Sequence, residues 1–77
     1  MYNIGAQFKR IRLEKNLTQK QVAEGIGVAE QQYQRYEYEK VEPSASKLIA
    51  LADYYDISLD YLTGRSDDPA RRRRKLF

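Results

Sequence analysis

The chain has 77 residues, 42% of them hydrophobic, and it contains neither cysteine nor histidine. This length allows one compact domain, and the missing residue types exclude disulfides, thiolate metal sites and the usual zinc ligand sets. Residues 71–75 contribute five positive charges to a net charge of +3, which leaves the rest of the chain at −2, so net charge alone does not argue for nucleic-acid binding.

The first predicted helix lies near the start of the sequence. Ile4, Phe8 and Ile11 recur at steps of four and three, which places them on one helical face. The pattern stops near Asn16, a residue type tolerated in the left-handed conformation that ends many helices.

No run of about 18 apolar residues exists, and residues 1–5 lack the features of a signal peptide. We therefore expect a cytoplasmic protein without a membrane span.

A second helix is predicted from Thr18. Thr18 precedes Gln21 by three residues, the spacing of a capping box, in which each side chain satisfies a backbone N–H at the helix start. Its inward side is formed by Val22, Ala23 and Ile26. The run Gly25-Ile26-Gly27 ends the helix after about two turns, because Gly27 can adopt a positive φ without steric cost.

A third helix is predicted to begin at residue 29 or 30 and to end between residues 38 and 40. The inward candidates are Val28, Tyr33 and Tyr36. Pro43 follows, and Ser44 is a good N-cap for a fourth helix. The inward side of that helix is expected to contain Leu48, Ile49, Leu51, Ala52 and Tyr55.

A short fifth helix completes the predicted fold. Ser58 caps it and Gly64 closes it. Its apolar residues are Leu59, Tyr61 and Leu62. We therefore predict an all-α, compact five-helix domain over residues 1–66, followed by a flexible basic tail over residues 67–77.

Several short motifs, in order and without insertion, carry a resemblance to a known family. They are Leu17-Thr18-Gln19, Val22-Ala23, Ile26-Gly27-Val28, Tyr36-Glu37, Pro43-Ser44 and Ser58-Leu59-Asp60-Tyr61-Leu62-Thr63-Gly64. With them the chain resembles the lambda repressor/Cro-like (Xre) helix-turn-helix family over roughly residues 4–66. The resemblance implies that the second helix crosses the DNA backbone and the third enters the major groove. It also implies a sequence-specific transcriptional regulator, most simply a repressor, that binds a double-stranded DNA operator as a homodimer.

Polar residues of the third helix are the predicted base contacts. In the major groove, glutamine can bond adenine, arginine can bond guanine, and glutamate can accept a hydrogen bond from cytosine. This chemistry and the resemblance assign base reading to Glu30, Gln31, Gln32, Gln34 and Arg35. Without the resemblance, the same run would equally well be a solvated helix face.

A second set of residues is predicted to contact phosphates. Gln19 matches the family position that bonds a phosphate through its side chain and the helix N-terminus, although it would also serve as an ordinary first-turn residue. Lysine and arginine near a duplex gain from counterion release, whereas solvent exposure alone is the other interpretation of each lysine. The full predicted set is Arg10, Gln19, Lys20, Tyr38, Lys40 and Lys47.

Arg12 and Glu37 occupy positions that, in this family, form an ion pair between the first and third helices. The implied role is structural, because the pair fixes the angle of the recognition helix. A buried charge left without its partner costs several kcal/mol, so Arg12→Ala is expected to loosen or unfold the domain.

The chain departs from the family pattern in four respects. Ala29 stands where serine or threonine usually caps the third helix, at a cost of about 1 kcal/mol. Tyr33 replaces a smaller aliphatic residue, which implies either a widened core or a hydroxyl that reaches the surface. Glu39 replaces a glycine, so we expect the left-handed turn there to be rebuilt. Acids also outnumber bases between residues 30 and 42, which is unfavourable beside phosphates.

Two further groups of residues have several interpretations. Tyr54 and Tyr61, on the last two helices, are candidates for a dimer contact, with ordinary packing as the alternative. The basic tail would be an arm along phosphates or in the minor groove, a general polyanion-binding end, or an expression remnant. Its charged residues are Arg71, Arg72, Arg73, Arg74 and Lys75.

Other functional classes fit the sequence less well. An enzyme is not expected, because there is no histidine, cysteine, carboxylate pair at a cleft spacing or glycine-rich phosphate loop, and neither a cofactor nor a metal is expected. The alternative function is a protein-interaction module, or an antitoxin, that retains the helix-turn-helix fold. The acidic residues around the third helix favour that alternative.

Overall fold

The computed structural model describes residues 4–70, and within them the chain forms five α-helices and no strand. The helices are α1 (Ile4–Glu14), α2 (Gln19–Ile26), α3 (Glu30–Glu37), α4 (Ala45–Tyr55) and α5 (Leu59–Leu62). The predicted all-α, five-helix domain is therefore confirmed, as is the order of its elements. No helix in the described part of the chain is long and apolar enough to cross a membrane.

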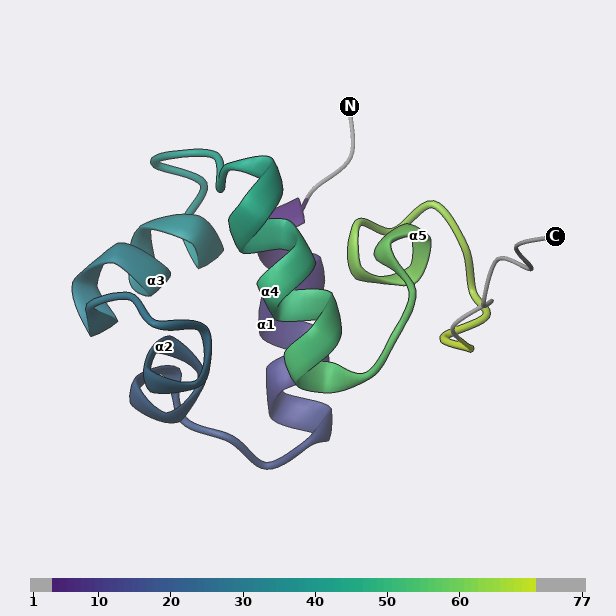
Figure 1. The fold of residues 1–77 in the computed structure, drawn as a ribbon, viewed down its shortest axis with the longest axis horizontal. Helices are drawn as coiled ribbons and strands as arrows, with labels where there is room; N and C mark the ends of the chain where they lie inside the picture. The colour runs from purple at the N-terminus through teal and green to yellow at the C-terminus, as the bar shows by residue number, and fades with distance from the viewer. Residues whose placement is uncertain (1–3, 71–77) are drawn as a thin grey trace, which may run out of the picture.

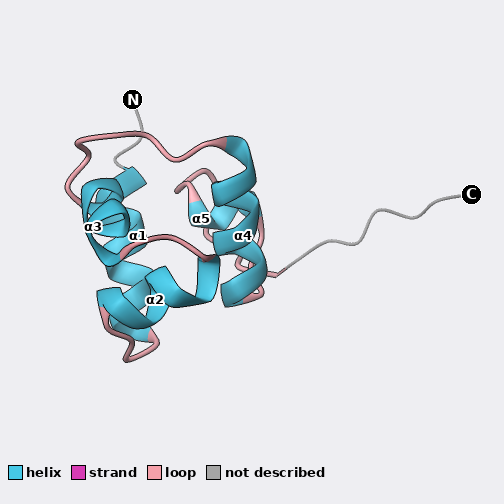
Figure 2. Ribbon diagram, turned by 60° about the vertical axis from the view of Figure 1, so that its left-hand side comes forward, coloured by secondary structure: helices cyan, strands magenta, loops and turns pink. Residues whose placement is uncertain are grey.

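The helices surround one core. Figure 1 shows α1 and α4 in the middle of the molecule, with α2 and α3 on one side and α5 on the other. In the turned view of Figure 2, α2 lies below α3, and α4 stands across the molecule from α3. α3 packs on α1 and α2, whereas α5 packs on α1 and α4. The buried hydrophobic residues are Phe8, Ile11, Val22, Ala23, Ile26, Tyr33, Tyr36, Leu51, Ala52, Tyr55, Ile57 and Leu62.

Local sequence explains most helix boundaries. The predicted capping box is present: Thr18 Oγ1 accepts the Gln21 N–H at 3.0 Å, and the Gln21 side chain accepts the Thr18 N–H at 2.8 Å. Asn16 adopts a left-handed φ of 57° after α1, and Gly27 a φ of 79° after α2. Ser44 and Ser58 accept backbone N–H groups at the starts of α4 and α5. These signals act over a few residues, which is why the sequence reveals them.

The ends of α3 differ from the other helix ends. Ala29 offers no side-chain hydrogen bond to the helix start, as expected from its methyl group. The prediction that the turn after α3 would be rebuilt is wrong, because Glu39 itself adopts a left-handed φ of 59°. Hydrogen bonds from the Glu39 N–H to Tyr36 O (3.2 Å) and from the Lys40 N–H to Arg35 O (2.9 Å) hold that conformation. α3 also ends at Glu37, one residue before the predicted range.

Ile49, which was predicted to face the core, is 49% exposed. Leu59, an apolar residue of the fifth helix, is also exposed, at 45%. The buried residues of α4 are Leu51, Ala52 and Tyr55, with Leu48 partly buried, and these positions follow one helical stripe that leaves Ile49 outside. Tyr54 is 38% exposed but also lies against α2, since a Cβ on Gly25 would be 2.6 Å from Tyr54 Cδ1.

The chain after α5 turns back towards the start of that helix. The Ser58 N–H donates to the Pro69 carbonyl oxygen at 3.1 Å, and the Asp68 N–H donates to Ser66 Oγ at 3.0 Å. The predicted division into residues 1–66 and 67–77 stays a prediction. The basic residues Arg71 to Lys75, with their expected polyanion contact, lie outside the described residues.

Candidate nucleic-acid interface

The turn between α2 and α3 sets the angle between these two helices. Gly27 occupies the left-handed region, where a side chain would strain the backbone even though a Cβ would meet no neighbour within 4 Å. The Val28 N–H then donates to the Ala23 carbonyl oxygen at 3.0 Å, which closes the end of α2. Val28 packs against the core from this turn. This short connection holds α3 across α2 and leaves one face of α3 in solvent.

The outer face of α3 presents most of the predicted base contacts. Glu30, Gln31 and Arg35 are exposed, whereas Gln34 is half-buried. Gln32 is also half-buried, and its Nε2 makes a long hydrogen bond of 3.4 Å to the Tyr36 hydroxyl. The structure therefore leaves Glu30, Gln31 and Arg35 exposed on α3, whereas Gln32 and Gln34 are only partly accessible.

The inner face of α3 is tightly buried. Tyr33 has no exposed surface, and Tyr36 is 4% exposed with its ring edge-on to Tyr33 at 6.3 Å between centroids. The Tyr33 hydroxyl does not reach the surface, and neither it nor the Tyr55 hydroxyl has a hydrogen-bond partner among the described residues. Burial raises the pKa of both hydroxyls, that of Tyr55 to about 12. The whole Tyr33 side chain, including its hydroxyl, is therefore enclosed in the core.

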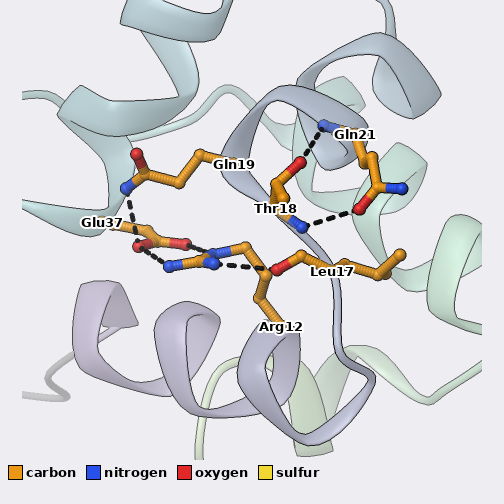
Figure 3. Close-up of polar contacts among 6 residues, drawn as sticks. All are labelled: Arg12, Leu17, Thr18, Gln19, Gln21 and Glu37. Atoms are coloured by element: carbon orange, nitrogen blue, oxygen red, sulfur yellow. Dashed lines mark hydrogen bonds and ion pairs between the residues drawn. The ribbon is translucent and has the colours of Figure 1, made fainter.

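A buried ion pair joins α1 to α3 (Figure 3). Arg12 Nε donates to Glu37 Oε2 at 2.6 Å and Arg12 Nη2 donates to Glu37 Oε1 at 3.1 Å. Arg12 Nη1 also donates to the Leu17 carbonyl oxygen at 2.9 Å. The Glu37 side chain is fully buried and that of Arg12 is 10% exposed. Three elements (α1, the loop before α2, and α3) are thus tied together by one guanidinium group.

Gln19 joins the same network from the first residue of α2. Its Nε2 donates to Glu37 Oε1 at 3.1 Å (Figure 3). Burial alone would raise the pKa of Glu37, but the hydrogen bonds and positive charge that face it outweigh burial, so the pKa of Glu37 lies below its ordinary value. Glu37 is therefore a carboxylate at neutral pH, and Gln19 is oriented by it.

A shallow depression, which we call the notch, opens between α1, the start of α2 and α3. Its rim is formed by Lys9, Thr18, Gln19, Glu30 and Tyr38. The Arg12–Glu37 pair forms its floor. Of the predicted phosphate contacts, Gln19 and Tyr38 meet here, and Tyr38 is 60% exposed. Sequence reasoning missed Lys9, because only the packing of α1 against α3 brings it to this place.

The other predicted phosphate contacts are dispersed. Lys20 is exposed beside Gln19, Lys40 is exposed directly after α3, and Lys47 is half-buried in the first turn of α4. Arg10 lies elsewhere: Nη1 bonds Glu14 at 2.7 Å, and its guanidinium stands 5.4 Å from the centre of the Tyr61 ring. Because Tyr61 belongs to α5, Arg10 faces the side of the molecule opposite α3 (Figure 1).

The sequence and the fold both match known proteins. The model of the helix-turn-helix family matches residues 8–62. Bacillus subtilis YobD, an uncharacterized HTH-type transcriptional regulator, is 43% identical over 63 residues, which are 82% of this chain and 56% of YobD. The CTXphi transcriptional repressor RstR from Vibrio cholerae is 40% identical over 65% of this chain and 45% of its own length. The chain thus spans about half the length of these relatives.

Two solved structures share the arrangement of helices. The P22 c2 repressor protein, crystallised in complex with a synthetic operator, superposes with a TM-score of 0.75 over 82% of this chain and 96% of that chain, at 24% identity. A transcriptional regulator from Listeria innocua gives a TM-score of 0.78 over 88% of this chain and 64% of that chain, at 28% identity.

Proposed function

The chain belongs to the helix-turn-helix family, and from this premise we propose that it is a sequence-specific, double-stranded DNA-binding transcriptional repressor. The observation that carries the proposal is the two-sided build of α3. Its inner face is locked by Tyr33, Tyr36 and Glu37, whereas its outer face leaves Glu30, Gln31 and Arg35 in solvent. A helix held rigidly from behind, with free glutamine and arginine side chains in front, suits insertion into a major groove.

The notch supports a phosphate contact beside that helix. The notch lies at the start of α2, where the first backbone N–H groups of a helix have no partner within the helix, and Lys9, Gln19 and Tyr38 add side-chain donors around it. Lys20, next to Gln19 in the sequence, and Lys40, in the loop after α3, are exposed. We retain them as proposed phosphate contacts together with Lys47. Arg10 is the weakest member of the predicted set, since its contacts with Glu14 and Tyr61 hold it beside α5.

We propose a homodimer as the binding form. Exposed apolar side chains on the last two helices support it, namely Ile49, Tyr54 and Leu59. Such side chains are unfavourable in water and would be covered in a symmetric pair, which would match two operator half-sites. Tyr61 contributes less than its sequence position suggests, because it is half-buried under Arg10.

The proposed repressor would act where the DNA is, so the proposal includes a cytoplasmic location. It assigns no catalytic reaction to the domain.

The test is selection of binding sites from a random pool of double-stranded DNA with the full chain, followed by affinity measurements at physiological salt. The expected result is an enriched inverted repeat with half-sites about one helical turn apart, bound at least about a thousandfold more tightly than scrambled DNA. A pool without enrichment, with only salt-sensitive binding, would contradict the proposal. It would instead favour a protein-interaction module or an antitoxin that retains this fold.

A further inference from the structure

Glu30 is the acidic residue at the start of the recognition helix, and its surroundings assign it a definite task. We propose that Glu30 determines operator specificity by selecting a cytosine opposite the first turn of α3 and by weakening binding to DNA without that cytosine. This inference rests on the proposed function. It adds to that function which base Glu30 selects and how DNA without that base is rejected.

The Glu30 side chain is free to act in this way. It is exposed in the first turn of α3, on the rim of the notch that also contains Lys9, Gln19 and Tyr38. It has neither a hydrogen bond nor an ion pair with any of residues 4–70 in the structure. By contrast, the other carboxylate of the notch, Glu37, is occupied by Arg12 and Gln19. The oxygen atoms of the Glu30 side chain are therefore available to accept hydrogen bonds from an incoming ligand.

The charges around the notch make unmatched DNA unfavourable. Arg12 is neutralised by Glu37 in the floor, so its charge does not attract a phosphate. Lys9 and Glu30 are then the remaining charged groups, and they are of opposite sign. A duplex that approaches α3 therefore brings its phosphates close to the Glu30 carboxylate, and this carboxylate loses water without gaining a donor when the facing base offers none. Binding that relies on the DNA backbone alone is weakened in consequence.

A matched base removes this penalty. A carboxylate can only accept hydrogen bonds. In the major groove, cytosine offers the N4 amino group, whereas guanine offers acceptors, thymine an acceptor and a methyl group, and adenine an N6 donor beside the N7 acceptor. Cytosine is thus the base whose own edge gives a carboxylate a donor without an adjacent acceptor. Glutamine has both a donor and an acceptor and would prefer adenine instead.

Glu30 also has a structural role that the test must separate from selection. An acidic side chain in the first turn favours a helix through the dipole, and α3 has no side-chain cap at Ala29. Replacing Glu30 alone would therefore weaken the helix start. The matched pair of proteins is Ala29→Ser, which supplies the missing cap, and Ala29→Ser/Glu30→Gln, which removes the charge in the capped background.

Both full-length variants are put through selection from the same random double-stranded pool, and their affinities for their selected sites and for scrambled DNA are measured. The capped single variant is expected to select a cytosine at one position of each half-site, and the double variant an adenine there. The double variant should also bind scrambled DNA more tightly and should lose about tenfold in the affinity ratio between selected and scrambled DNA.

Two other outcomes are distinguishable. If both proteins select the same bases at every position, and binding to scrambled DNA is unchanged or weaker, Glu30 only supports the helix and the inference is overturned while the proposed function stands. If neither protein enriches any site, although both melt as folded domains, the proposed function and the inference fail together.

Discussion

Two arginines on α1, only two residues apart, make different connections. Arg12 reaches α3, where its side chain is 10% exposed and Nε lies 2.6 Å from Glu37 Oε2. Arg10 reaches α5, where its side chain is 45% exposed, Nη1 lies 2.7 Å from Glu14 Oε2, and the guanidinium covers Tyr61. The distances are nearly equal, so distance alone cannot rank the two contacts.

Burial separates them. Water can replace every partner of Arg10 when its contacts are broken, and exposed ion pairs contribute about 0–1 kcal/mol. The Glu37 side chain has no exposed surface, so the loss of Arg12 would leave a buried carboxylate without its cation. The α1–α3 junction is therefore fixed by a polar lock, the buried Arg12–Glu37 pair. The polar contacts of the α1–α5 junction are exposed or only partly buried, namely those of Arg10 and the hydrogen bond of 2.8 Å from Gln7 Nε2 to the Tyr61 carbonyl oxygen. The recognition helix is thus tied to α1 by a buried ion pair.

Among the tests of this comparison, removal of Arg12 is expected to change the free energy of unfolding the most. Arg12→Ala should reduce the free energy of unfolding by about 3–5 kcal/mol, because Glu37 remains buried without a cation. Urea denaturation followed by circular dichroism measures the change. Arg12→Met/Glu37→Leu, which removes both charges at similar volume, should recover most of the loss; if the double variant is as unstable as the single one, an uncompensated charge is not the cause.

Acid should weaken the same lock gradually. The pKa of Glu37 is lower in the folded protein than its ordinary value of about 4.5. Stability from this group is therefore fully present above pH 4.5 and is lost as the pH falls through the lower folded pKa. Denaturation curves recorded between pH 7 and pH 3 should show the decline, and Arg12→Met/Glu37→Leu should show a shallower one. Equal slopes for both proteins would remove Glu37 from the explanation.

A substitution at Gly5 tests how closely the backbones of α1 and α3 pack against each other. A Cβ at this position would collide with the Glu37 carbonyl oxygen and lie 2.8 Å from the Tyr36 carbonyl oxygen, both of which belong to the backbone. Gly5→Ala should therefore cost about 1–3 kcal/mol, despite the higher helix propensity of alanine. Thermal melting measures it. A variant more stable than the original protein would mean that α1 and α3 can move apart without a cost in free energy. That result would contradict a tight junction between the two helices.

Arg10→Ala is the matched control with the smallest expected effect. Exposed ion pairs and cation–π contacts of this kind contribute up to about 1 kcal/mol, so the melting temperature should change by a few degrees at most. Salt should reduce even this difference, because exposed charges are screened. If Arg10→Ala were as damaging as Arg12→Ala, burial would not explain the difference between the two junctions.

Local signals in the sequence were sufficient for much of the fold. The Thr18–Gln21 capping box, the left-handed Asn16 and the Gly27 turn each depend on neighbours within a few residues, so they could be predicted. Ile49 could not be placed correctly, because its exposure depends on which stripe of α4 meets the core. Glu39 was misjudged for a similar reason: hydrogen bonds from the flanking backbone hold its left-handed conformation.

The candidate site was less accessible to sequence reasoning. The resemblance placed Arg12 opposite Glu37, but the hydrogen bond from Gln19 to Glu37 and the position of Lys9 on the notch are results of tertiary packing. Arg10 and Lys9 are adjacent in the sequence and equally basic, yet the rotation of α1 turns one towards α5 and the other towards α3. A helical rotation of about 100° per residue, invisible in composition, decides which cation faces the proposed DNA.

The most direct test of the central claim compares the full chain with Gln31→Ala in selection from one random DNA pool, together with the melting temperature of each protein. Gln31 lies on the outer face of α3, away from the lock. The predicted result is a changed base preference at one position of each half-site, with the melting temperature shifted by no more than about 4 °C. An unchanged preference, or a large loss of stability, would contradict a division of α3 into a face that reads DNA and a face that holds the fold.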